Sequence, residues 1–108
     1  MSKLPLPTIS ANSDGFRLES HLGQAQFFSW GHVKEVRAYK LDFLTTDEVR
    51  LDISVGDEPT RITLSEEMVG FRSFAAEAEA QLGFPVNWWT DVVKPAFETN
   101  ERVLYRHA

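Results

Sequence analysis

The stretch from Thr60 to Gly83 constrains the fold more than any other part of the chain. It begins with alternating polar and apolar residues, which is typical of a half-buried strand, and continues as a run rich in alanine and glutamate. Within that run apolar residues recur every three or four positions, as they do along one face of a helix. A strand that passes directly into an amphipathic helix requires a sheet that the helix can cover.

The strand before this stretch predicts how the sheet is paired. Residues 49–55 alternate between apolar and polar side chains, and a loop that contains Gly56 and Pro59 joins them to the next strand. We expect Val55 to lie opposite Thr60, because this closure brings the apolar positions of both strands to one face. The remaining apolar pairs in that register are Ile53 with Ile62 and Leu51 with Leu64.

The amphipathic helix is expected to run from about Glu66 to Leu82. Ser65 is a favourable N-cap, and Gly83 is typical of the residue that follows a helix. Gly70 does not fit this assignment, since glycine inside a helix costs about 1 kcal/mol relative to alanine. Either the helix begins near Gly70 after a loose turn, or Gly70 allows a close approach to the sheet.

The residues before the hairpin predict an arm and further strands. Residues 1–12 contain Pro5 and Pro7 and are expected to form an extended arm, whereas residues 13–108 form a single domain. Gly31 indicates a bulge or a single helical turn. Alternation predicts a strand at 16–20, and the turn at Gly23 leads into a second at 25–29. A third strand is expected at 34–44, where neither face is cleanly apolar, so we expect a bulge along it.

The residues after the long helix predict a second, shorter one. It should run from Trp88 to about Val93, because Asn87 is a favourable N-cap and Pro95 disfavours continuation. The tail, residues 96–105, should pack back as a helical turn or an edge strand. The expected class is therefore α+β, with a curved antiparallel sheet or partial barrel of five to six strands, the amphipathic helix and a short C-terminal helix.

Composition and charge exclude several classes of function. The net charge of −5 and the pI near 5.1 oppose binding to nucleic acid, which depends on clustered lysine and arginine. The absence of cysteine excludes disulfides and thiolate metal sites. No stretch approaches the 18 apolar residues of a membrane span, and the two early prolines do not fit a signal peptide. We expect a cytoplasmic protein.

The chain contains no motif for catalysis, for a cofactor or for a metal ion. It has no nucleophile motif and no glycine-rich phosphate loop, and its histidines do not follow a metal-ligand spacing. His32 and Glu35 could orient an imidazole for acid–base chemistry. A histidine at a junction between strands is more often structural, so we expect neither a cofactor nor a metal.

The tryptophans are the strongest candidates for a binding surface. Adjacent residues on a helix point in directions about 100° apart, so Trp88 and Trp89 should not both face the core. Exposed tryptophans are enriched where protein partners dock, although core packing is the more common role. The candidate binding residues, chosen from this helix, the tail and the Gly31 junction, are Trp88, Trp89, Phe97, His32 and Trp30.

The order of elements resembles the pleckstrin-homology-like folds of bacterial domains. The residues that carry this resemblance are the Trp-Gly-His-Val junction at 30–33 and the helix after the last strand. Segments 64–71 and 88–100 are similar to parts of small uncharacterised bacterial proteins of about this length. A full pleckstrin-homology barrel has seven strands before its helix, whereas five are evident here. The resemblance implies a fold and no particular function.

Three functions are compatible with the sequence. The preferred interpretation is a non-enzymatic binding or protein-interaction module, acting as a homodimer or with another protein. The first alternative is a small enzyme or ligand-binding protein with a pocket between helix and sheet, using His32, Glu35 or Asp52 as polar groups. The second alternative is an acidic immunity-type or inhibitor protein that neutralises a basic partner.

Overall fold

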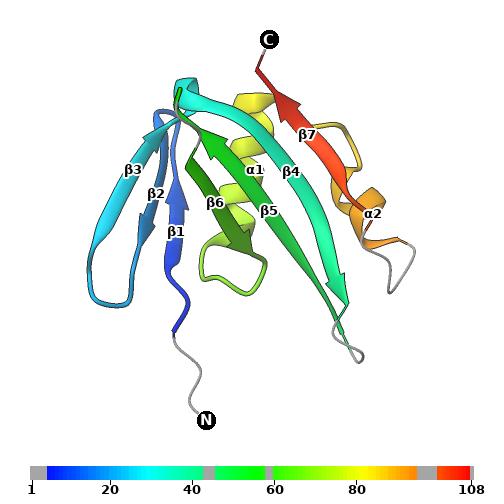
Figure 1. The fold of residues 1–108 in the computed structure, drawn as a ribbon, viewed down its shortest axis with the longest axis horizontal. Helices are drawn as coiled ribbons and strands as arrows, with labels where there is room; N and C mark the ends of the chain where they lie inside the picture. Colours follow the sequence, from blue (N-terminus) through cyan, green and yellow to red (C-terminus); the bar gives the residue numbers. More distant parts are fainter. Residues whose placement is uncertain (1–4, 43–45, 58–59, 95–99, 108) are drawn as a thin grey trace.

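The computed structural model describes residues 5–42, 46–57, 60–94 and 100–107. They form seven antiparallel strands and two α-helices, joined in part by one 3₁₀ turn (Figure 1). The elements in chain order are β1 (Thr8–Ala11), β2 (Gly15–Glu19), β3 (Ala25–Ser29), the 3₁₀ turn η1 (Trp30–His32), β4 (Val33–Asp42), β5 (Asp47–Val55), β6 (Thr60–Ser65), α1 (Phe71–Leu82), α2 (Trp88–Val93) and β7 (Arg102–Arg106).

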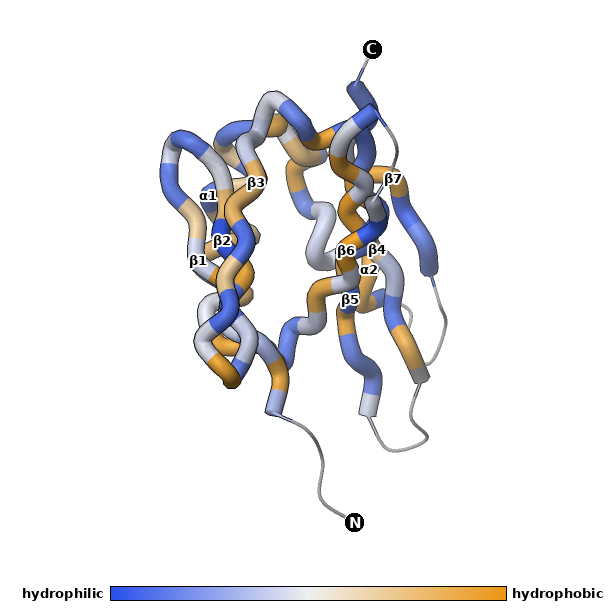
Figure 2. The backbone as a smooth tube through the Cα atoms, turned by 60° about the vertical axis from the view of Figure 1, so that its left-hand side comes forward, coloured by the Kyte–Doolittle hydropathy of each residue, from blue (hydrophilic) through white to orange (hydrophobic). Residues whose placement is uncertain are grey.

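The strands belong to two sheets. Sheet A has the order β1-β2-β3, and sheet B has the order β6-β5-β4-β7. Figure 2 shows the strands of the two sheets as separate groups, and Figure 1 shows α1 behind β5 and β6. The predicted α+β class with antiparallel strands is confirmed. The strands are nevertheless divided between two sheets, because the η1 turn at Gly31 directs the chain from β3 into sheet B.

The predicted number of five to six strands is too low. The described residues form seven, because residues 8–11 of the predicted arm pair with β2 as strand β1. Ile9 is buried in the core, so this part of the arm is held by packing as well as by hydrogen bonds. The tail also forms a strand, since β7 pairs with β4 at the edge of sheet B.

The predicted register of the β5–β6 hairpin is confirmed. Val55 lies opposite Thr60, and the apolar pairs Ile53–Ile62 and Leu51–Leu64 follow. Both pairs face the core and are buried. The alternation of β5 therefore determines which face of sheet B is covered.

Helix α1 begins at Phe71, not at about Glu66 as predicted. Residues 66–70 form turns, in which the Ser65 hydroxyl accepts a hydrogen bond from the N–H of Glu67 at 3.1 Å. Ser65 thus stabilises a turn before the helix rather than the first turn of the helix itself.

Gly70 explains why the helix begins where it does. Its φ of 89° lies in the left-handed region, which favours glycine, and its N-cap position precedes Phe71. A Cβ atom on Gly70 would lie 1.9 Å from the carbonyl oxygen of Ile9. The neighbouring Val69 carbonyl accepts a hydrogen bond from the Ile9 N–H at 3.0 Å. Both predicted alternatives for Gly70 are confirmed: the helix begins next to it after a turn, and the glycine allows a close approach to sheet A, at strand β1.

An aromatic cluster joins α1 to sheet A. The ring of Phe74 lies 5.3 Å from that of Phe16 and 5.9 Å from that of Trp30, measured between centroids. Phe28 stacks on Phe16 at 5.1 Å. These distances are typical of favourable aromatic pairs, and the cluster forms the part of the core between the helix and this sheet.

A buried lysine attaches α2 to sheet B. The side chain of Lys40 is 1% exposed and lies on the inner face of β4. Its ammonium group lies 3.1 Å from the Asp47 carboxylate and donates to the Val93 carbonyl at 2.8 Å. A buried charge requires such partners, so this position ties β4, β5 and α2 together.

Candidate functional site

The two tryptophans of α2 occupy different environments, as predicted. Trp88 is buried, and its indole N–H donates to the Glu79 carboxylate at 3.4 Å. Trp89 is partly exposed, and the guanidinium carbon of Arg72 lies 4.9 Å from its ring centroid. The α2 segment begins at Asn87, which adopts a left-handed φ of 71° and makes no side-chain cap. A small hollow of about 190 Å³ lies between α1 and α2 beside Trp89.

The predicted binding residues Trp30 and His32 do not line this hollow. Trp30 is 8% exposed, and its indole N–H donates to the Asn12 carbonyl at 2.8 Å, so it serves the core. His32 is exposed at the end of η1. Phe97 lies outside the described residues. The structure therefore does not bring together the four residues of this set that it describes.

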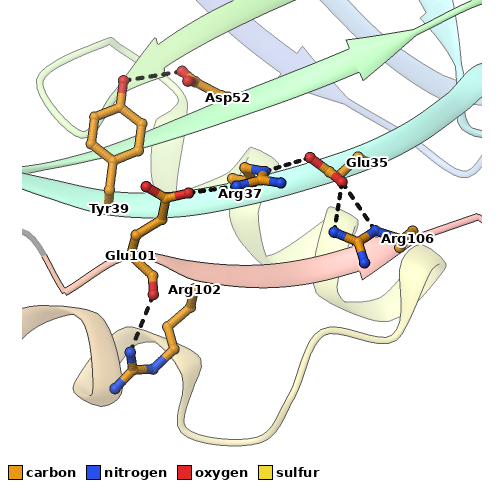
Figure 3. Close-up of polar contacts among 7 residues, drawn as sticks. All are labelled: Glu35, Arg37, Tyr39, Asp52, Glu101, Arg102 and Arg106. Atoms are coloured by element: carbon orange, nitrogen blue, oxygen red, sulfur yellow. Dashed lines mark hydrogen bonds and ion pairs between the residues drawn. The ribbon is translucent and has the colours of Figure 1, made fainter.

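A polar network covers the outer face of sheet B (Figure 3). Arg37 donates to Glu35 at 2.5 Å and to Glu101 at 2.7 Å, and Arg106 donates to Glu35 at 3.1 Å. Glu35 is thus paired with two arginines rather than with His32. The network links β4 to β7, which is an edge strand of sheet B.

A second group of polar residues on this outer face joins β4, β5 and β6. The Tyr39 hydroxyl donates to the Asp52 carboxylate at 3.0 Å, and the Thr63 hydroxyl donates to the same oxygen at 2.8 Å. A hollow of about 270 Å³ is lined by Glu35, Arg37, Tyr39, Asp52, Arg61 and Glu101. This hollow lies on the face of sheet B that points away from α1, whereas the predicted pocket lay between helix and sheet.

The protonation states of this face favour a structural role. The hydrogen bond from Arg37, followed by that from Arg106, holds the pKa of Glu35 below its usual value, against the effect of burial. Hydrogen bonding to Glu35 and Glu101 raises the pKa of Arg37. Burial, followed by the hydrogen bond to Asp52, raises the pKa of Tyr39. General acid–base catalysis works best with a group that titrates near neutral pH, and these three shifts lead away from it.

Replacing Glu35 by glutamine is expected to lower stability only where Glu35 is ionised. Because its folded-state pKa is lowered, the contribution is fully present above the unfolded value of about 4.3 and disappears as the pH falls through the lower folded value. At pH 7 the loss should be below about 1 kcal/mol, since the network is partly exposed. Urea unfolding at pH 7 and at pH 3 measures both values.

The matched control is Glu77→Gln. The carboxylate of Glu77 accepts a hydrogen bond from the neutral side chain of Gln81 at 3.2 Å, so its replacement removes no arginine contact of this kind. A difference between wild type and Glu35→Gln that stays the same at pH 3 would contradict the assigned role of the two arginines.

The β2–β3 hairpin exposes two large apolar side chains. Phe27 is 56% exposed on β3, and Leu22 in the turn is 76% exposed. The inner face of the hairpin borders a hollow of about 540 Å³, lined by Pro7, Leu18, Ser20, Gln24 and Gln26. Single exposed apolar residues are common, but their combination with an open hollow indicates a binding surface.

The hydrogen bonds of the hairpin show which backbone groups of β3 point outward. Ser20 N–H donates to Gln24 O at 2.7 Å, and Trp30 N–H donates to Asp14 O at 3.3 Å. In an antiparallel pair bonded positions alternate, so the even-numbered residues of β3 face β2. The N–H and C=O groups of the odd-numbered residues therefore point away from the sheet; these residues are Ala25, Phe27 and Ser29.

Among the sheet edges in the described chain, only that of β3 lacks both a cover and a charge. The edge of β1 is occupied, because Ile9 is bonded to Val69. The edge strands of sheet B carry arginines, Arg61 on β6 and both Arg102 and Arg106 on β7. Charged side chains on edge strands discourage pairing with another chain. Figure 1 shows β3 as the outermost strand of sheet A.

The sequence predicted both strands of this hairpin, but not that β3 could be a binding edge. The available signal was the absence of Asp, Glu, Lys and Arg from residues 20–33, which is unusual for a chain with 25% charged residues. That absence becomes informative only once β3 is known to be an edge strand. A central strand with the same composition would need no explanation.

Two features are absent from the part of the chain that the structure describes. No group of three or more His, Asp or Glu side chains there is arranged to hold a metal ion. No helix in the described ranges is long and apolar enough to cross a membrane.

Comparison of the chain with protein-family models, with curated proteins and with solved structures gives no match.

Proposed function

We propose that this protein is a non-enzymatic interaction module that binds another polypeptide by strand addition to β3. The observation that carries the proposal is the open, uncharged edge of this strand, with Phe27 exposed on it. In strand addition the main-chain hydrogen bonds supply affinity, and alternate side chains supply specificity. The covered edge of β1 and the arginine-bearing edges of β6 and β7 suit this purpose less well.

The hairpin offers groups that complement an extended chain. The backbone of Ala25, Phe27 and Ser29 presents both donors and acceptors along the outer edge. On the inner face, the side chains of Gln24 and Gln26 border the hollow and can donate and accept at the same time. A bound strand would place every second side chain on that inner face, beside the hollow.

The fold and setting of this module are part of the proposal. Antiparallel strands followed by an amphipathic helix support a pleckstrin-homology-like fold, although the strands lie in two sheets and β7 follows α2. An acidic chain without cysteine fits a cytoplasmic bacterial protein, and its net charge of −5 argues against a nucleic-acid partner.

Replacing Phe27 by lysine is expected to abolish strand addition. A lysine on an edge strand discourages pairing, and its outward side chain leaves the bonds from β3 to β2 intact. Peptides of twelve residues selected from a random displayed library against the wild type should bind the Phe27→Lys variant at least about tenfold more weakly. Fluorescence titration measures the affinities, and amide NMR shifts on binding should concentrate at Ala25, Phe27 and Ser29.

The matched control is Val103→Lys. Val103 is an exposed apolar residue on the edge strand β7 of the other sheet, so the chemical change is of the same kind. Its variant should bind the selected peptides like the wild type. Peptides that bind Phe27→Lys unchanged would contradict the proposal, and shifts confined to α2 would transfer the binding site to the hollow beside Trp89.

A small apolar ligand is the second candidate. The hairpin hollow, at about 540 Å³, falls within the range of about 300–1,000 Å³ that ligand pockets occupy. In this case a bound compound would shift the resonances of Leu18 and Gln26 on the inner face and leave the outward amide of Phe27 unchanged.

The acidic inhibitor alternative has less support. An inhibitor of a basic partner needs carboxylates that are available to that partner. On the outer face of sheet B, Glu35 and Glu101 are instead paired with Arg37.

A further inference from the structure

We infer that the strand added to β3 is β3 of a second copy of this chain, antiparallel about a two-fold axis that passes beside Phe27. This inference rests on the proposed function, since it names the polypeptide that occupies the same edge. A two-fold interface brings one surface against itself, so the edge must complement itself in hydrogen bonding, in charge and in shape. The edge of β3 meets each of these requirements.

The hydrogen-bonding requirement selects one register. Antiparallel strands bond where the residues directly opposite each other both turn their N–H and C=O groups toward the partner. The outward residues of β3 are Ala25, Phe27 and Ser29. When Phe27 lies opposite Phe27 of the second copy, Ala25 of each copy lies opposite Ser29 of the other. All three outward residues of each copy then form bonded pairs, and two hydrogen bonds in each pair give about six in total. If the axis passed beside Gln26 or Phe28 instead, one outward residue of each copy would have no residue of the partner's β3 directly opposite it, and its hydrogen bonds would be lost.

The charge requirement is also met. A charged residue near a two-fold axis would face the same charge on the second copy, but residues 20–33 contain no Asp, Glu, Lys or Arg. The edge of β7 fails this test, because an axis beside Leu104 would place Arg102 opposite Arg106 of the second copy. The edge of β6 also carries a charge, at Arg61.

The side chains of the edge complement one another in size and character. On the outer face, the exposed ring of Phe27 would meet Phe27 of the second copy, and cross-strand aromatic pairs are favourable. The small residues Ala25 and Ser29 would lie on either side of that pair. On the inner face, Gln26 would lie opposite the half-buried Phe28. The two three-stranded sheets would join into one sheet of six strands.

Sedimentation velocity over a range of protein concentrations tests whether the copies associate. We expect the wild type and Val103→Lys to show a concentration-dependent dimer, and Phe27→Lys to remain a monomer at every concentration. Circular dichroism of each variant shows that the fold is retained. A dimer that persists in Phe27→Lys would place the interface elsewhere and overturn the inference.

Single cysteines test the register without removing Phe27. The chain has no cysteine, so each introduced thiol is the only one present. Residues directly opposite in a bonded pair have Cα atoms about 5.5 Å apart, within the range of about 4.4–6.8 Å that a disulfide spans. A mixture of Ala25→Cys and Ser29→Cys should therefore cross-link under mild oxidation. Either variant alone should not, because its two thiols would be separated by four residues along the strands, about 13 Å.

The outcomes separate this inference from the proposed function. Two results would show that a second copy does not occupy this edge. One is a wild type that stays monomeric at every concentration. The other is an Ala25→Cys variant that cross-links alone as readily as the mixture does. If such a monomeric protein still binds selected peptides with shifts at Ala25, Phe27 and Ser29, strand addition stands and the added strand belongs to another protein. If no peptide shifts these amides and no dimer forms, both fail.

Discussion

Replacing Phe74 by alanine is expected to lower the free energy of unfolding by about 3–5 kcal/mol, the usual cost of removing a buried phenylalanine ring. Phe74 is 1% exposed, and its ring packs against Phe16 and Trp30. Because the cluster joins α1 to sheet A, the substitution should leave a cavity where the helix meets the sheet. Urea titration followed by circular dichroism measures the loss.

The matched control is Phe27→Ala. This ring is 56% exposed, so its removal takes little apolar surface from the core, and surface substitutions usually change stability by no more than about 0.5 kcal/mol. The comparison belongs at low protein concentration, where association through β3 does not contribute. Equal losses for the two variants would mean that the aromatic cluster does not carry the stability assigned to it.

Replacing Gly70 by alanine is expected to destabilise the protein by about 2–4 kcal/mol. The φ of 89° costs a residue with a Cβ atom about 1–2 kcal/mol, and an inserted methyl group in a packed site costs about 1–3 kcal/mol more. The added Cβ would lie 1.9 Å from the Ile9 carbonyl oxygen, so β1 and the start of α1 must separate. Thermal and urea unfolding both report the change.

Gly83→Ala separates the two contributions. Gly83 has a similar φ of 75°, but no atom outside its immediate neighbours lies within 4 Å of the position a Cβ would take. Its replacement should therefore cost only the backbone contribution, about 1–2 kcal/mol. If Gly70→Ala were no worse than Gly83→Ala, the contact between Gly70 and Ile9 would not be close in solution.

The β5–β6 hairpin could be predicted because its information is local. The alternation of each strand fixes its apolar face, and the short loop fixes the closure at Val55 and Thr60, so one register satisfies both. This pattern does not depend on contacts with residues that are distant in the sequence. The bounds of β3 were also predicted from a local signal, the turn at Gly23, as 25–29, and they are observed as Ala25–Ser29.

The same rules left the start of α1 open between Glu66 and a position near Gly70. Ser65 followed by two glutamates is a strong local signal for a helix start. The competing constraint is the contact of Gly70 with Ile9, a residue far away in the sequence. Likewise, Pro5 and Pro7 predicted an arm, whereas the pairing that makes Thr8–Ala11 a strand is supplied by β2.

The candidate site was less predictable than the fold, because exposure depends on what covers each element. Trp30 and Trp89 are the same residue type, yet one lies in the core and the other is partly exposed. Local sequence could predict that the two tryptophans of α2 differ in exposure, since adjacent helical residues diverge, but not which of them is buried, and it gave no account of Phe27. The openness of β3 results from the η1 turn, which takes the chain away to sheet B.

The pairing of β7 with β4 has a consequence for biosynthesis. Arg106 and Glu35 are bonded partners separated by 71 positions, so a ribosome completes β4 long before it makes the strand that bonds to its edge. During that interval the nascent chain presents an unpaired strand edge, the kind of surface that makes incomplete folding intermediates prone to aggregation. The acidic and basic side chains at Glu35 and Arg37 lie at that edge from the moment it emerges, and before β7 arrives they are well suited to keeping other nascent chains away.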